Sequence, residues 1–144
     1  MAPLPLAWRL RAVGTAFVVL PLLEWTSFAR VERALDALGR LLPARRVSHV
    51  AAAQWVDALL ARLPEPWRFT CLRRATVLHH LLRAAGAPLT LCIGVRREPD
   101  GSLHAHAWLL ESDALVLEPA LTADRVALFT EIARCPSSEA PRAA

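Results

Sequence analysis

One cysteine at the predicted start of a helix is the residue of this chain best placed for nucleophilic chemistry. Cys71 follows Thr70, whose hydroxyl can accept a hydrogen bond from a free backbone N–H and so cap the helix. Apolar residues then recur at helical spacing, at Leu72, Ala75, Leu78 and Leu82. The positive end of the helix dipole and the nearby Arg73 and Arg74 would favour the thiolate over the thiol. A small buried residue at a helix start is the alternative that this position alone favours.

Thiol acyl-transfer chemistry also needs a base and a group that orients the base. The thiolate attacks a carbonyl carbon, an imidazole passes a proton to the leaving amine, and a carboxylate fixes the imidazole tautomer. His104 and His106 share one face of a predicted strand, so strand geometry alone does not choose between them. A loop at 111–113 would place Glu118 directly opposite His106, whereas a loop one residue shorter or longer would make the contact diagonal. Taken singly, each histidine could equally be an exposed or a structurally hydrogen-bonded residue, and the position of Glu118 alone favours a surface carboxylate.

The composition is that of one globular domain. The chain has 144 residues, of which 55% are hydrophobic, which suits a sizeable core. All 17 basic residues are arginine, and the net charge is +4. Because these arginines are scattered without a basic run or interleaved aromatic residues, we expect no nucleic-acid binding.

The three cysteines are an odd number and form no CxxC pair. Cys71, Cys92 and Cys135 therefore argue against a disulfide framework and fit reduced thiols in the cytoplasm. The five histidines show no metal-ligand spacing with the cysteines. We expect a cytoplasmic protein that binds neither a metal nor another cofactor.

The hydrophobic pattern predicts helices first and antiparallel strands afterwards, an α+β fold. Residues 1–47 form a helical segment that packs on the core or on a partner; its apolar run is short for a membrane span and contains Pro21 and Glu24, so we do not expect membrane contact. The core is expected at 48–134 and a disordered tail at 135–144. The elements predicted in the core are a helix at 48–62, a helix from Cys71, strands at 89–95, 103–110 and 114–118, and a last helix at 121–133.

Four short motifs, by their joint spacing, resemble the transglutaminase-like leader peptidases of lasso-peptide biosynthesis. They are Cys71-Leu72-x-Arg74-Ala75, Leu-Leu-Arg-Ala-Ala-Gly at 81–86, Ile93-Gly94-Val95-Arg96 and His106-Ala107-Trp108. The resemblance covers about residues 48–120 and implies a papain/transglutaminase-like core with a Cys–His–acid triad. It assigns the nucleophile to Cys71 and the base to His106. The third member falls on Glu118, where the family usually has Asp, and Asp113 is the fallback.

The resemblance also implies a substrate and partners. Such enzymes remove the leader from a ribosomally made precursor peptide, so that a cyclase can close the core peptide into a macrolactam. Because residues 1–47 form two predicted helices rather than a small recognition module, we expect a stand-alone peptidase. Its partners would be the precursor's leader region, a separate leader-recognition protein and the lasso cyclase. A non-catalytic peptide-binding scaffold and a thiol acyltransferase of the transglutaminase-like class are the alternatives.

Overall fold

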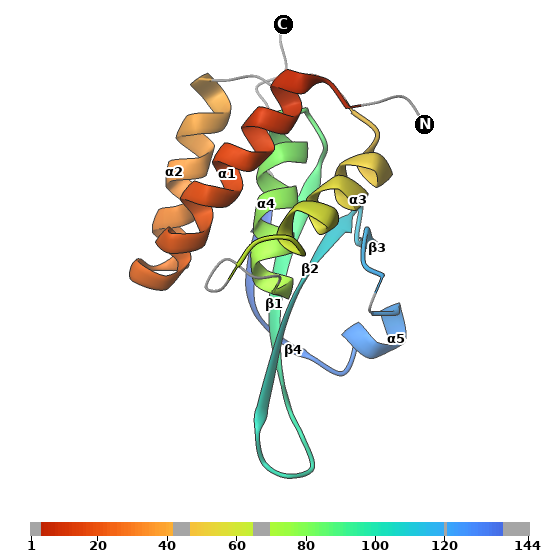
Figure 1. Cartoon of the computed structure of the whole chain (residues 1–144). Coiled ribbons are helices and arrows are strands. Elements are labelled where there is room, and N and C mark those ends of the chain that lie inside the picture. The colour runs from red at the N-terminus through yellow and green to blue at the C-terminus, as the bar shows by residue number, and fades with distance from the viewer. Residues whose placement is uncertain (1–3, 42–46, 65–69, 120, 137–144) are drawn as a thin grey trace, which may run out of the picture.

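The computed structural model describes residues 4–41, 47–64, 70–119 and 121–136. Within them, helices are followed by a four-stranded antiparallel sheet, so the predicted α+β class is confirmed (Figure 1). The elements are α1 (Leu6–Trp25), α2 (Phe28–Leu41), α3 (His49–Leu60), α4 (Cys71–Ala84), β1 (Leu89–Arg97), β2 (Leu103–Glu111), β3 (Ala114–Val116), α5 (Ala123–Val126) and β4 (Thr130–Pro136).

Helix α4 is the centre of the fold, because α1, α2, α3 and the strands β1 and β2 all contact it (Figure 1). Thr70 caps its first turn as predicted, accepting a hydrogen bond from the Arg73 backbone N–H at 3.3 Å. Gly86, with φ 88°, closes the helix in the left-handed conformation that favours glycine. The core-facing side chains of α4 are fully buried, namely Val77, Leu78, Leu81 and Leu82.

The sheet has the strand order β3-β2-β1-β4 and a different cluster of side chains on each face. One face, with Leu91 and Leu109, belongs to the main core that includes the helices. The other face carries Cys92 and Trp108, against which Phe129 packs. The hairpin of β1 and β2 extends beyond the helices (Figure 1), and at its base β3 pairs with residues 109–111.

The prediction of a helix at 121–133 is wrong. The chain forms only the short helix α5 there and then the strand β4, which pairs antiparallel with β1. The apolar spacing of Val126, Phe129 and Ile132 suggested a helix, but the free edge of β1 offers this segment a ladder of hydrogen bonds instead. Cys135 and Pro136, which were assigned to the tail, end this strand, and residues 137–144 lie outside the described residues.

The third strand is shorter than predicted, and the loop before it is also shorter. Ser112 and Asp113 form a two-residue turn with φ of 50° and 63°, the positive values typical of a tight hairpin. Strand β3 ends at Val116, and Leu117, with φ 55°, turns the chain away from the ladder. Glu118 therefore follows the strand rather than lying in it.

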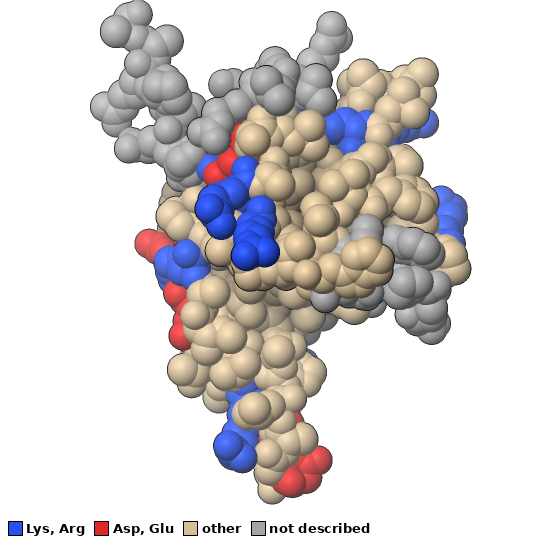
Figure 2. Space-filling model, turned by 90° about the vertical axis from the view of Figure 1, so that its left-hand side faces the viewer, with Lys and Arg blue, Asp and Glu red and all other residues tan. Residues whose placement is uncertain are grey.

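Helix α1 is apolar on two faces. The buried face contains Trp8, Ala12, Ala16 and Val19. The exposed apolar side chains are Leu6, Leu10, Phe17, Val18 and Trp25, which are 48–84% exposed. In the part of the chain that the structure describes, no helix combines the length and the apolar character needed to cross a membrane. On the face drawn in Figure 2, basic side chains stand in separate groups beside acidic ones, with a wide uncharged area between them.

Candidate active site

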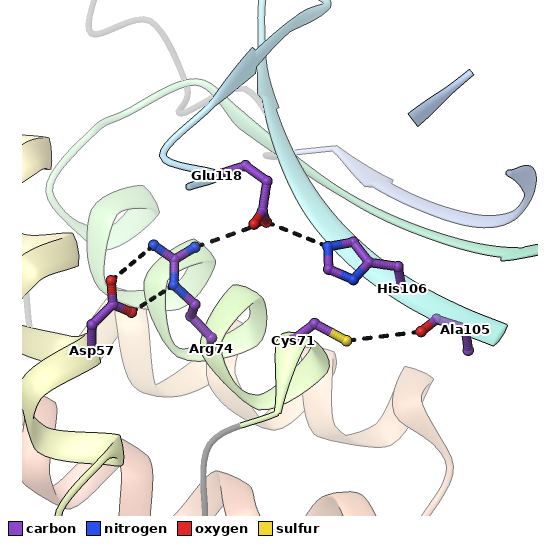
Figure 3. A network of polar contacts seen from close by, with 6 residues as sticks. All are labelled: Asp57, Cys71, Arg74, Ala105, His106 and Glu118. Atoms are coloured by element: carbon purple, nitrogen blue, oxygen red, sulfur yellow. Dashed lines mark hydrogen bonds and ion pairs between the residues drawn. The ribbon is translucent and has the colours of Figure 1, made fainter. Parts of the chain in front are cut away.

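The structure brings Cys71, His106 and Glu118 together from three separate elements (Figure 3). Cys71 is the first residue of α4, His106 lies on β2, and Glu118 follows β3. The His106 Nε2 atom lies 3.5 Å from the Glu118 Oε2 atom, and the other ring nitrogen faces Cys71. Both side chains are largely withdrawn from solvent, with 12% of His106 and 6% of Glu118 exposed. A thiol, an imidazole and a carboxylate in this order can transfer an acyl group.

The surroundings of the Cys71 sulfur favour the thiolate. Burial opposes the charge, but the hydrogen bond and the charge of His106, together with the backbone N–H groups of Ala107 and Leu72, lower the pKa of Cys71 overall. The Leu72 N–H is available because the first N–H groups of a helix have no partner within it. In the thiol form, the sulfur lies 4.0 Å from the Ala105 carbonyl oxygen.

The same contacts favour the protonated imidazole. The interaction with Cys71 and then that with Glu118 outweigh burial and raise the pKa of His106 to about 9. The two shifts together favour a thiolate–imidazolium pair, with Glu118 on the far side of the ring. The 3.5 Å contact with Glu118 is longer than a full hydrogen bond and acts through charge.

Glu118 reaches His106 by a route that the strand pattern did not predict. The two-residue turn pairs Leu109 with Val116, so Glu118 would not lie directly opposite His106 even if β3 continued. Instead the left-handed Leu117 redirects the chain, and the length of the glutamate side chain completes the contact.

A buried arginine joins Glu118 to helix α3 (Figure 3). Arg74 donates from Nε and Nη2 to the two carboxylate oxygens of Asp57 at 2.6 and 3.1 Å. Its Nη1 atom lies 4.0 Å from the Glu118 Oε2 atom. Arg74, expected from its position to favour the Cys71 thiolate, instead points towards carboxylates. The spacing of three residues from Cys71 signals this shared helix face, but nothing in the sequence singles out Asp57.

The alternative histidine and carboxylate lie elsewhere. His104 is exposed, and its ring lies 5.8 Å from that of Phe129. The Asp113 side chain is 88% exposed and pairs with Arg134 at 3.2 Å. Geometry therefore brings His106 and Glu118, rather than His104 and Asp113, to the cysteine.

An aromatic side chain supports His106 from the outer face of the sheet. The rings of His106 and Trp108 are nearly parallel, at 12°, with centroids 6.4 Å apart. Gly94 pairs with His106 on the neighbouring strand, and a Cβ atom there would lie 2.7 Å from the Trp108 ring. Glycine at this position therefore makes room for the indole that flanks the imidazole.

Helices followed by an antiparallel sheet, with a cysteine opening the central helix, are consistent with a transglutaminase-like core. A family model described as the transglutaminase-like superfamily matches residues 4–134, and the chain belongs to this superfamily. The match includes α1 and α2, which the sequence analysis set apart from the core. Membership indicates cysteine-protease or acyltransferase activity. Comparison with curated proteins and with solved structures gave no significant match.

The described residues contain no group of three His, Cys, Asp or Glu side chains that could hold a metal ion.

Proposed function

We propose that this chain is a cysteine peptidase that removes the leader from a ribosomally synthesised lasso-peptide precursor. The observation that carries the proposal is the contact of Cys71 with His106, backed by Glu118, at the start of α4. The motifs around Cys71 and His106 supply the resemblance to leader peptidases, and the superfamily supplies the class of chemistry.

The first half of the reaction cleaves the peptide bond. The Cys71 thiolate attacks the scissile carbonyl carbon, and the free N–H groups at the start of α4 can stabilise the resulting oxyanion. His106 enters this step protonated and gives its proton to the leaving amine. Glu118 holds the ring in orientation and balances its charge. The products are a free amine and a thioester on Cys71.

The second half releases the acyl group. His106, now neutral, takes a proton from water as the water oxygen attacks the thioester carbon. The C–S bond breaks, the Cys71 thiolate returns, and a carboxylic acid leaves. If an amine took the place of water, the same thioester would give an amide, which is the acyltransferase outcome.

Partner proteins would bring the precursor to this site. We assign the presentation of the leader to a separate recognition protein and the closure of the core peptide to the lasso cyclase. The exposed apolar side chains of α1 support a docking role for this helix, because contiguous apolar surface commonly marks protein interfaces. These side chains are Leu6, Leu10, Phe17, Val18 and Trp25.

Leader removal can be tested with a lasso precursor peptide and its leader-recognition protein. We expect Cys71→Ala to abolish the release of the leader, measured by mass spectrometry, with the circular dichroism of the wild type retained. His106→Ala should lower the rate by at least about 10³-fold, whereas His104→Ala should change it little. Cys135→Ala is the matched control and should cleave normally. Normal cleavage by Cys71→Ala would refute the proposal, and an amide at the new terminus would identify an acyltransferase.

A further inference from the structure

The strand that carries His106 has an uncovered edge beside the cysteine. Strand β3 pairs with residues 109–111 of β2, and no strand among the described residues pairs with this edge between Leu103 and Trp108. Figure 1 shows the tip of the hairpin beyond the helices, and Figure 2 shows the hairpin as a narrow projection. Leu103 and Ala105 are exposed there.

Contacts with Cys71 show which backbone groups point to this edge. The sulfur is within reach of the Ala105 carbonyl oxygen and of the Ala107 N–H. Because the polar groups of alternate residues in a strand point to the same side, the Ala105 N–H and both polar groups of Leu103 point there as well. The Ala105 N–H and the two polar groups of Leu103 therefore form a short row of donors and acceptors along this edge, and the row ends at the sulfur.

Among the described residues, the exposed part of this edge lacks the charged side chains, proline and bulge that often block an exposed strand. The opposite edge of the sheet, β4, has a register irregularity beside Gly94 and carries the ion pair of Glu131 with Arg134. Leu103 and Ala105 are exposed residues of β2 whose backbone faces this edge, and they have neither charge nor a proline ring. An unprotected edge of this kind is a template for another strand.

We propose that this edge binds the substrate as an added β-strand, with the backbone of an extended peptide pairing with Leu103 and Ala105. The inference rests on the proposed function and specifies how that site takes its substrate. An added strand that pairs with these residues runs directly to the Cys71 sulfur, because the Ala105 carbonyl lies 4.0 Å from it. Main-chain hydrogen bonds supply the affinity in this mode, so an extended peptide of plain alanine should be recognised.

A backbone-only alkylating probe tests this binding mode without knowledge of the natural sequence. Acetyl-tetraalanyl chloromethyl ketone should alkylate Cys71 roughly 100-fold faster than chloroacetone, since each added hydrogen bond contributes up to about tenfold. In further probes, one alanine at a time carries an N-methyl group. The rate advantage over chloroacetone should fall only when alternate alanines are methylated, because successive amides of a strand point to opposite sides. Rates are measured on the full wild-type chain, with mass mapping to confirm the modified cysteine.

Two variants at one position complete the experiment. Ala105→Pro removes the N–H and places a ring on the edge, and should lower the peptide advantage by about tenfold or more. Because Ala105 lies beside the sulfur, the advantage is taken as the ratio of the peptide rate to the chloroacetone rate of the same variant. Ala105→Ser keeps the N–H and should retain the wild-type ratio. If Ala105→Pro does not fold, the N-methylated probes still test on the wild type whether the peptide binds as an added strand.

Several results would overturn the added strand. These are equal rates for the peptide and chloroacetone, equal losses at all N-methylated positions, or a dimer that Ala105→Pro dissociates, which would assign the edge to a second copy. Failure of the proposed function can be distinguished from failure of the added-strand binding mode. If Cys71 does not react even with chloroacetone, the nucleophile is wrong, whereas alternating N-methyl effects without leader cleavage keep the binding edge and reject the natural substrate.

Discussion

Glu118 is one methylene longer than the aspartate expected in its place, and the structure uses that length. Because Leu117 in the left-handed conformation sets the backbone of Glu118, the longer side chain reaches the His106 Nε2 atom at 3.5 Å. Arg74 lies on the other side of the carboxylate and restricts its movement.

Substitution of Glu118 tests this orienting role. Glu118→Gln keeps the size but removes the charge, and should lower kcat by roughly 10²–10⁴-fold with little change in KM, since the imidazolium loses its orienting carboxylate while Arg74 keeps its contact with Asp57. Glu118→Asp keeps the charge but not the reach, and should lie between that variant and the wild type. The control is Asp113→Asn, on the exposed turn, which should cleave at the wild-type rate. Equal activity of Glu118→Gln and the wild type would remove Glu118 from the site.

The thiolate–imidazolium pair predicts different pH dependences for alkylation and for peptide cleavage. Because contact with His106 lowers the pKa of Cys71, alkylation by iodoacetamide should rise with pH at a lower pH than for an ordinary free thiol, whose pKa is about 8.5. Cleavage also needs the imidazolium as proton donor, so it should fall again as His106 deprotonates above about pH 9.

His106→Ala provides the comparison for this pair. Without the imidazolium the pKa of Cys71 should rise, and the alkylation curve should move to higher pH. Cys71→Ala fixes the background from the other two cysteines. An alkylation curve that is the same in His106→Ala and the wild type would show that the pair does not form.

At the scale of elements, the sequence was sufficient to predict the helices and strands whose ends are set by nearby residues. Helix α4 begins after the cap residue Thr70 and ends before Gly86, which has a left-handed conformation. Both effects act within a few residues of the sequence. The strands β1 and β2 follow from alternation around a turn at 98–101. The start of α4 and the strand of His106, and with them two of the three candidate site residues, could therefore be positioned from the sequence.

Elements that depend on distant partners could not be predicted in this way. Strand β4 forms because β1 has a free edge, which a helical spacing of Val126 and Phe129 could not reveal. The contact of Glu118 with His106 depends on one backbone angle, at Leu117. The link from Arg74 to Asp57 joins two helices, and only their packing brings these side chains together.

At the scale of the whole molecule, the helices enclose ionisable side chains as well as apolar ones. His79 and His80 on α4, which the sequence suggested would be exposed or packed, are 1% and 5% exposed. His79 Nε2 lies 3.2 Å from the Leu89 carbonyl oxygen, and His79 Nδ1 lies 3.6 Å from Glu32. Burial, and then the positive charge of Arg11, lower the pKa of His80 to about 4. Glu32 acts in the opposite direction, while His79 and Arg83 lower the pKa further.

The buried His80 predicts a loss of stability in acid. Between about pH 6.5 and pH 4 the unfolded chain binds a proton at His80 that the folded chain does not, so the free energy of unfolding falls as the pH falls. The shift corresponds to about 3 kcal/mol. Urea unfolding, followed by tryptophan fluorescence, gives the free energy of unfolding at each pH. Between pH 7 and pH 4 this free energy should fall by about 3 kcal/mol less in His80→Leu than in the wild type. His104→Leu, at an exposed position on β2, should retain the wild-type decrease. An equally steep decrease in His80→Leu would mean that His80 is protonated in the folded protein and that the layer between α1, α2 and α4 admits its charge.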